Sequence, residues 1–200
     1  IRKMVGRDVL IERKNTQTQF QNTILKVNNL NLNHPNNKKR KLLHDISFEL
    51  KKGEILGIFG LMGAGRTELL ETLFGMHPAN SQYNLEIDKK NTFHKKPKEA
   101  IENGLAFVTE DRKTEGLILG MDISSNISLT SLPTFGILNP SRDKESSKDY
   151  IEKLRIKTPS EMQLCQNLSG GNQQKVVLAK WLATNPQILM MDEPTRGIDI

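Results

Sequence analysis

The sequence predicts an α/β domain built on a mainly parallel sheet. Three short apolar runs without alternation, at residues 55–59, 105–108 and 188–191, are typical of central parallel strands that are covered on both faces. Segments with helix start and stop signals separate these runs. Strands that alternate with helices along a chain favour parallel pairing within one sheet.

The composition fits one ordinary globular domain of 200 residues. Hydrophobic residues make up 36% of the chain, which suffices for a core and excludes a disordered or collagen-like protein. The single cysteine, Cys165, excludes an intramolecular disulfide and favours a reducing compartment, and we expect an inert thiol there. No apolar run approaches the length that a transmembrane helix needs.

The predicted elements follow a linker. Residues 1–22 are polar and lack a sustained period, so they predict a linker, and residues 23–200 predict the domain itself. Strands are expected at 24–27 and at 42–50, in addition to the three apolar runs. Helices are expected from Arg66 to about Phe74, from Pro97 to before Gly104, from Ser141 to about Arg155, and from Ser169 onward. The last helix carries an apolar stripe with one charged interruption, Lys180, and we expect its Trp181 to pack in the core.

The basic excess of the chain lies in its first quarter. Residues 1–53 hold 12 Lys and Arg against 4 Asp and Glu, whereas the whole chain has a net charge of +6. Such an arm can contact nucleic acid or anionic lipid. No aromatic residues are interleaved for base stacking, so a solvated loop is favoured and no nucleic-acid partner is expected.

A glycine-rich turn follows the first apolar run and opens a helix, which is the context of a phosphate-binding P-loop. Backbone N–H groups in such a loop turn toward an anion, and the helix N-terminus adds a favourable dipole. Taken alone, the pattern also fits an ordinary strand-to-helix turn. The residues of this Walker A segment are Gly60, Leu61, Met62, Gly63, Ala64, Gly65, Arg66 and Thr67.

Two further motifs lie downstream. The run at 188–191 leads directly into Asp192 and Glu193, a Walker B pattern that brings one carboxylate to Mg²⁺ and a second to the attacking water. Between the two Walker motifs, Ser169 caps a helix whose first glycines expose N–H groups. The residues of this signature loop are Ser169, Gly170, Gly171, Asn172 and Gln173.

With all three motifs in this order, the chain resembles the nucleotide-binding domain of ATP-binding cassette (ABC) ATPases. Residues 60–68, Glu110 to Lys113 with Gly116, and 192–199 are similar to the second ATPase domain of tandem ATP-binding proteins in bacterial monosaccharide importers, of the ribose and galactose/methyl-galactoside type. The resemblance implies a P-loop NTPase fold with an N-terminal antiparallel β subdomain and a helical signature subdomain at about 118–183. It also implies that the domain is incomplete at residue 200, upstream of the family's switch His.

The resemblance implies a role for each motif, with ATP and Mg²⁺ as cofactors. Walker A would bind the phosphates, Thr67 and Asp192 would hold Mg²⁺, and Glu193 would be the general base. The signature loop would act in trans on a γ-phosphate held by the other ATPase domain. Glu110 occupies the position of the Q-loop, and a D-loop made of Gly197, Ile198 and Asp199 would cross the dimer interface.

The chain departs from the family pattern at two of these positions. Arg66 replaces the P-loop Lys, and Glu110 replaces the usual Gln; both resemble the second domain of the subgroup, whose own site is regarded as degenerate. An adenine-stacking aromatic residue is not evident, because Phe20 lies too early and His34 also reads as a solvated loop residue.

The expected function is therefore ATP hydrolysis coupled to monosaccharide uptake. The implied partners are the first ATPase domain of the same protein, membrane permease subunits and, indirectly, a periplasmic or lipid-anchored sugar-binding protein, at the cytoplasmic face of the inner membrane. The amphipathic segment between about Asp122 and Gln166 is expected to help dock the permease. Two alternatives stay open: a soluble ABC ATPase of DNA repair or translation, and a non-hydrolysing nucleotide-dependent dimerisation module. For the 200-residue chain alone we expect negligible hydrolysis.

Overall fold

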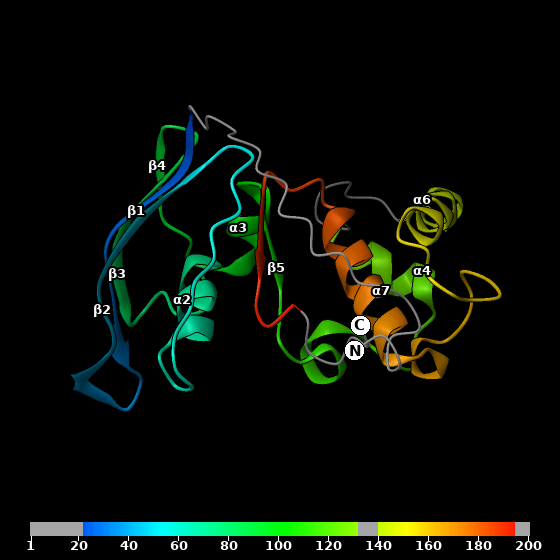
Figure 1. Cartoon of the computed structure of the whole chain (residues 1–200), viewed down its shortest axis with the longest axis horizontal. Coiled ribbons are helices and arrows are strands. Elements are labelled where there is room, and N and C mark those ends of the chain that lie inside the picture. The colour runs from blue at the N-terminus through cyan, green and yellow to red at the C-terminus, as the bar shows by residue number, and fades with distance from the viewer. Residues whose placement is uncertain (1–21, 132–139, 195–200) are drawn as a thin grey trace, which may run out of the picture.

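The computed structural model describes residues 22–131 and 140–194. These residues form one four-stranded sheet and one two-stranded sheet. Figure 1 shows the larger sheet at one end, the smaller one in the middle and a group of helices at the other end. The strands are β1 (Thr23–His34), β2 (Asn37–Lys51), β3 (Ser81–Ile87), β4 (Lys90–Thr92), β5 (Leu105–Val108) and β6 (Ile188–Met191). The helices are α2 (Arg66–Leu73), α3 (Pro97–Glu102), α4 (Ile123–Ser128), α6 (Pro140–Lys153) and α7 (Gly170–Leu182), with the short turns η1 (Arg112–Gly116) and η2 (Cys165–Asn167).

The large sheet is antiparallel, with the strand order β2-β1-β3-β4. Its central strand β1 alternates: Leu25 and Val27 are buried, and the residues between and beside them are not. Val27 pairs with Phe48 of β2 on one side and with Leu85 of β3 on the other. Because buried side chains alternate along β1, one apolar face of the sheet packs against the core. The sequence predicted β1 and β2 as shorter strands and did not predict β3 or β4.

A second sheet, separate from the first, is parallel and consists of β5 and β6 among the described residues. All four residues of β5 are buried, which agrees with the prediction of a central strand covered on both faces. Leu105 pairs with Ile188, and Val108 pairs with Met191. The two strands therefore end together, and the residues that follow them lie at one edge.

An aromatic cluster joins the centre of the molecule to the helices. The ring of Phe74, at the end of α2, lies 5.6 Å from the ring of Phe107 in β5 and 5.5 Å from that of Trp181 in α7. Trp181 is buried, so its predicted role in core packing is confirmed. Aromatic rings at this separation add to the stabilisation that their burial provides.

The predicted helices begin and end close to the expected residues. The helix from Arg66 ends at Leu73, where Phe74 is the C-cap and Gly75 takes a φ of 84°. The Ser169 side chain accepts a hydrogen bond from Asn172 N and so caps α7, as predicted. Helix α4 was not predicted as an element.

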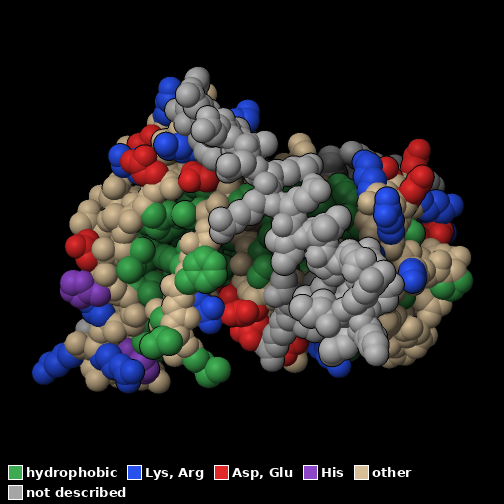
Figure 2. All heavy atoms as spheres, viewed as in Figure 1, with side chains coloured by type: hydrophobic (Ala, Val, Ile, Leu, Met, Phe, Trp, Pro, Cys, Tyr) green, Lys and Arg blue, Asp and Glu red, His purple; other side chains and the backbone are tan. Residues whose placement is uncertain are grey.

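The expected strand at 55–59 is wrong. These residues form no strand, and the exposed fractions of the Ile55 and Phe59 side chains are 97% and 93%. A strand needs a partner for its N–H and C=O groups, and within 22–131 and 140–194 no strand pairs with this segment. Figure 2 shows hydrophobic side chains at the surface beside the four-stranded sheet.

Within the described ranges, no helix has both the length and the apolar character that spanning a membrane requires.

Candidate nucleotide-binding site

The site begins where the two Walker motifs meet. Asp192 N donates to Val108 O at 2.9 Å, which extends the β5–β6 pairing by one residue and fixes the start of the Walker B turn. The Thr67 hydroxyl, in the first turn of α2, donates to Asp192 Oδ2 at 2.6 Å. These residues are 125 positions apart in sequence. A hydroxyl and a carboxylate side by side form a donor set of hard oxygens, which suits Mg²⁺.

The Walker A loop has the backbone shape that its glycines permit. Gly63 and Gly65 take φ values of 78° and 85°, in the region that favours glycine. The loop folds back on itself, since a Cβ added at Gly60 would lie 2.9 Å from the Cβ of Ala64. Gly65 packs against β2, where an added Cβ would lie 2.5 Å from Leu43 Cδ2. A glycine-lined turn at the start of a helix fits a phosphate group.

Arg66 and Glu193 form an ion pair across this site, with 2.9 Å between Arg66 Nη1 and Glu193 Oε1. The two side chains are 35% and 41% exposed, so water screens the pair in part. Glu193 takes a φ of 43°, an uncommon conformation for a residue with a Cβ. The residue expected to hold phosphate and the residue expected to activate water therefore contact each other.

The signature loop is exposed at its tip and anchored below it. Ser169 is exposed, and a Cβ added at Gly171 would meet no atom within 4 Å. Asn172 accepts a hydrogen bond from Lys157 N at 2.9 Å. Gln173 is buried and donates to Cys165 O at 3.0 Å, so its side chain faces the core and not a partner. Within the signature loop, Ser169 is exposed and residues 170–172 are half-buried, so a partner can reach residues 169–172.

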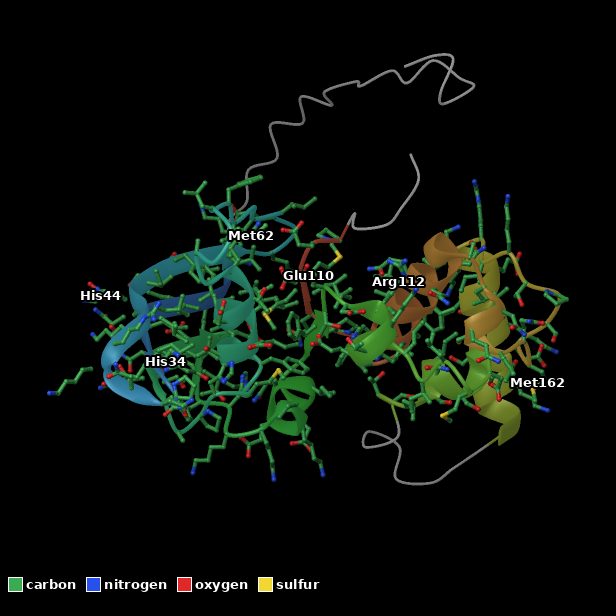
Figure 3. All side chains as sticks on the ribbon, turned by 90° about the horizontal axis from the view of Figure 1, so that it is seen from below. His34, His44, Met62, Glu110, Arg112 and Met162 are labelled. Carbon is green, nitrogen blue, oxygen red and sulfur yellow. The ribbon has the colours of Figure 1, made fainter. Side chains whose placement is uncertain are left out.

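The Q-loop position lies at the end of β5. Glu110 is half-buried and lines a surface pocket together with Asp111, Arg112 and Lys113. Asp111 accepts a hydrogen bond from Lys113 N at 2.8 Å and so caps η1. In Figure 3, Glu110 and Arg112 lie between the four-stranded sheet and the helices, and Met62 lies at the outer surface.

His34 lies away from this edge. It closes the β1–β2 turn, where its Nδ1 accepts a hydrogen bond from Asn36 N at 3.2 Å. Figure 3 shows His34 and His44 on the four-stranded sheet and not beside Glu110. The D-loop residues Gly197, Ile198 and Asp199 lie outside the described residues.

The amphipathic segment turns its apolar side inward. Ile156 is buried, and Ile151 and Leu154 pack against the core. The side chains of this segment that stay exposed include charged ones on α6 and, before η2, the apolar Met162 and Leu164. The spacing of Ile151, Leu154 and Ile156 in the sequence thus identified the side of this segment that faces the core, and not a side that faces a partner.

Sequence reasoning assigned no role to Lys180. This side chain is buried in α7, and its ammonium donates to Gly116 O, in the turn that follows Glu110. Burial lowers the pKa of Lys180 to about 8. Gly116 packs tightly here, since an added Cβ would lie 3.0 Å from Val177 Cγ2. Lys180 thus ties the Q-loop region to the signature helix, and the charged interruption in the apolar stripe was the signal for it.

The Cys165 thiol is fully buried, and burial raises its pKa to about 11. Its Sγ accepts a hydrogen bond from the Asn126 amide at 3.3 Å. A buried thiol with a raised pKa is a poor nucleophile, which agrees with the expected inert thiol.

A family model described as "ABC transporter" matches residues 43–196, which include the Walker A, signature and Walker B motifs. The chain belongs to the ABC transporter family. Membership in this family implies ATP binding and confirms the family resemblance that the motifs indicated.

Several relatives of this ABC chain carry the names of sugar import proteins. It is 49% identical to the ribose import ATP-binding protein RbsA of Rhodopirellula baltica over 203 residues, which cover all of this chain and 40% of that protein. It is 46% identical to the xylose import ATP-binding protein XylG of Moorella thermoacetica over 178 residues, which cover 88% of this chain and 35% of that protein. The chain thus spans about two fifths or less of these relatives.

Solved ABC cassettes share the fold. An ATP-binding cassette solved as a post-hydrolysis dimer with ADP and Pi has a TM-score of 0.75 at 22% identity, over 88% of this chain and 76% of that one. A cassette from an ABC transporter in its ADP conformation has a TM-score of 0.73 at 21% identity, over 90% of this chain and 72% of that one. At this identity the likeness establishes the α/β fold.

Proposed function

We propose that this ABC domain is the second cassette of a tandem ATP-binding protein that drives monosaccharide import. The observation that carries the proposal is the 2.6 Å contact between Thr67 and Asp192, which joins the two Walker motifs at one edge. Ligands of open α/β sheets bind at the carboxyl ends of the strands, and this edge is such a place. The relatives named for ribose and xylose import support a sugar as the cargo.

In the proposed cis site, the backbone of 60–67 and Arg66 bind the phosphates. Thr67 and Asp192 hold Mg²⁺, which supplies charge neutralisation when bound. Glu193 orients the attacking water. Each of these side chains comes from the edge formed by the start of α2 and the end of β6. The Arg66 fork is larger than the usual ammonium, so we expect this site to be the weaker one.

In the proposed trans site, the N-terminus of α7 stabilises a γ-phosphate held by the other cassette. Ser169 is exposed, and Gly170 and Gly171 leave the first N–H groups of the helix accessible. Preorganised N–H donors stabilise developing negative charge without reorganisation. The 13-residue helix behind them holds these donors in place.

The proposed partners follow from this assignment. The first ATPase domain of the same protein faces the signature loop, and a membrane permease contacts the pocket at Glu110 and the polar side of α6. A sugar-binding protein takes part indirectly, through the permease. The domain acts as a peripheral subunit at the cytoplasmic face of the membrane.

The test is ATP turnover by the full-length protein, with and without its permease in liposomes. We expect sugar uptake that depends on ATP, and turnover that rises when the permease and a sugar-loaded binding protein are present. Turnover that is indifferent to the permease favours a soluble ABC ATPase. Nucleotide-dependent dimerisation without turnover favours the non-hydrolysing module.

A further inference from the structure

The ion pair between Arg66 and Glu193 joins two groups that the proposed function assigns to different tasks. Arg66 is expected to contact phosphate, and Glu193 is expected to orient water. With 2.9 Å between Nη1 and Oε1, the guanidinium is already engaged by a carboxylate. A phosphate that enters the loop meets a cation whose charge is partly neutralised.

Each partner of the pair has an unusual local setting. On the Arg66 side, the stem of the side chain crosses the loop, since its Cδ lies 3.7 Å from the position of a Cβ at Gly60. On the Glu193 side, the φ of 43° stores conformational strain directly after the Walker B strand. The guanidinium of Arg is a long planar fork that reaches carboxylates readily, whereas a Lys ammonium is a point charge on a flexible stem.

We propose that the Arg66–Glu193 ion pair is a latch that holds the general base away from its working position until phosphate displaces it. The latch rests on the proposed function, because it regulates that same site. Phosphate oxygens and the Glu193 carboxylate compete for one guanidinium. Binding of the nucleotide therefore frees Glu193, and loss of the nucleotide restores the pair.

The first test needs no nucleotide. Thermal unfolding of the 200-residue chain is measured for wild type, Arg66→Met, Glu193→Gln and the double variant. The Met side chain keeps the apolar stem of Arg66, and Gln keeps the shape of Glu193. Removal of either partner of a half-exposed pair is expected to lower the melting temperature by about 1–3 °C. The double variant is expected to lower it no further than either single variant.

The second test measures ADP binding by calorimetry in EDTA, so that neither Mg²⁺ nor a γ-phosphate contributes. Glu193→Gln removes the competitor, and we expect it to tighten ADP binding about two- to fivefold. In the Arg66→Met background the same substitution is expected to change the affinity less than about 1.5-fold. The matched control is Glu68→Gln, which removes one carboxylate from the first turn of α2, the helix that carries Arg66.

Three results overturn the latch. The first is an equal gain from Glu193→Gln with and without Arg66. The second is a gain from Glu68→Gln as large as that from Glu193→Gln, since charge repulsion alone then explains both. The third is additivity of the two substitutions in the nucleotide-free chain. Additivity in the nucleotide-free chain overturns the latch even if the chain binds no ADP, and absence of ADP binding counts against the proposed function instead.

Discussion

The Walker A turn before α2 and the signature turn before α7 differ in exposure and in how the start of the helix is capped. All residues from 55 to 64 are exposed, and α2 begins at Arg66 with Gly65 as its N-cap, which provides no side-chain hydrogen bond. The signature turn begins at Ser169 with a side-chain cap and continues into α7, which buries Val176, Val177 and Ala179. Both turns lead into helices that bury core residues, since α2 buries Leu69 and Leu73. The Walker A turn is exposed along its length and lacks a side-chain cap, whereas the signature turn is held by one.

This difference indicates which turn can position a reacting group. Phosphoryl transfer depends on placement and charge stabilisation, and small displacements are costly. A turn fixed to a buried helix holds its N–H donors steadily, whereas the phosphate loop includes an engaged Arg66. The comparison therefore favours a stronger contribution in trans than in cis.

The largest effect is expected on ATP turnover in the proposed tandem protein. Ser169→Arg blocks the exposed tip of the signature turn and is expected to reduce hydrolysis by about 100-fold or more. Arg66→Ala is expected to do less damage, because the cis site contributes less. Steady-state ATPase assays on both variants check this. If Arg66→Ala is the more damaging substitution, the comparison between the two turns is wrong.

The next effect is on the free energy of unfolding, compared between one buried and one exposed phenylalanine. Phe107 is buried in β5 and packs on Phe74, so Phe107→Ala is expected to lower the free energy of unfolding by about 3–5 kcal/mol. Phe59 is exposed, and Phe59→Ala is expected to change it by less than about 0.5 kcal/mol. Urea unfolding measures both. A cost at Phe59 similar to that at Phe107 would show that the 55–59 segment is packed in solution.

The buried Lys180 in α7 makes the free energy of unfolding depend on pH. Burial lowers the pKa of Lys180 from 10.5 to about 8. Below pH 8 the folded chain keeps a costly buried charge, and between pH 8 and 10.5 it releases the proton that the unfolded chain still holds. Stability relative to Lys180→Met is therefore expected to rise by about 2–3 kcal/mol from pH 7.5 to 10.5.

Unfolding of both forms at several pH values measures this difference. Tyr83 and Cys165 have raised pKa values and oppose the trend, but they act equally in wild type and in Lys180→Met. A difference between the two forms that stays constant with pH would mean that Lys180 is solvated in the folded chain.

The smallest effect distinguishes two glycines. At Gly65 a Cβ meets Leu43 and the φ is 85°, so Gly65→Ala is expected to lower the free energy of unfolding by about 1–2 kcal/mol. At Gly171 a Cβ meets nothing and the backbone is helical, so Gly171→Ala is expected to raise it by about 0.5 kcal/mol. Thermal unfolding compares the pair. Equal effects would show that the phosphate loop is not held against β2.

The elements whose signals are local could be predicted from the sequence. The bounds of β5 and β6 follow from four-residue apolar runs, and the starts of α2 and α7 follow from a glycine turn and a serine cap. Each of these signals depends on residues within one turn or one strand. The order of the three motifs then indicated the family, because each motif is a short stretch of consecutive residues that can be recognised without the fold.

The contacts between distant residues could not be predicted from the sequence, because they depend on how the segments pack. The run at 55–59 has the composition of a buried strand, but a strand exists only where another strand completes its hydrogen bonds, and sequence carries no record of that pairing. The same holds for the ion pair between Arg66 and Glu193 and for the contact of Lys180 with Gly116. Each depends on the packing of segments that lie more than 60 residues apart, and side-chain contacts of that range arise from the fold and not from local propensity.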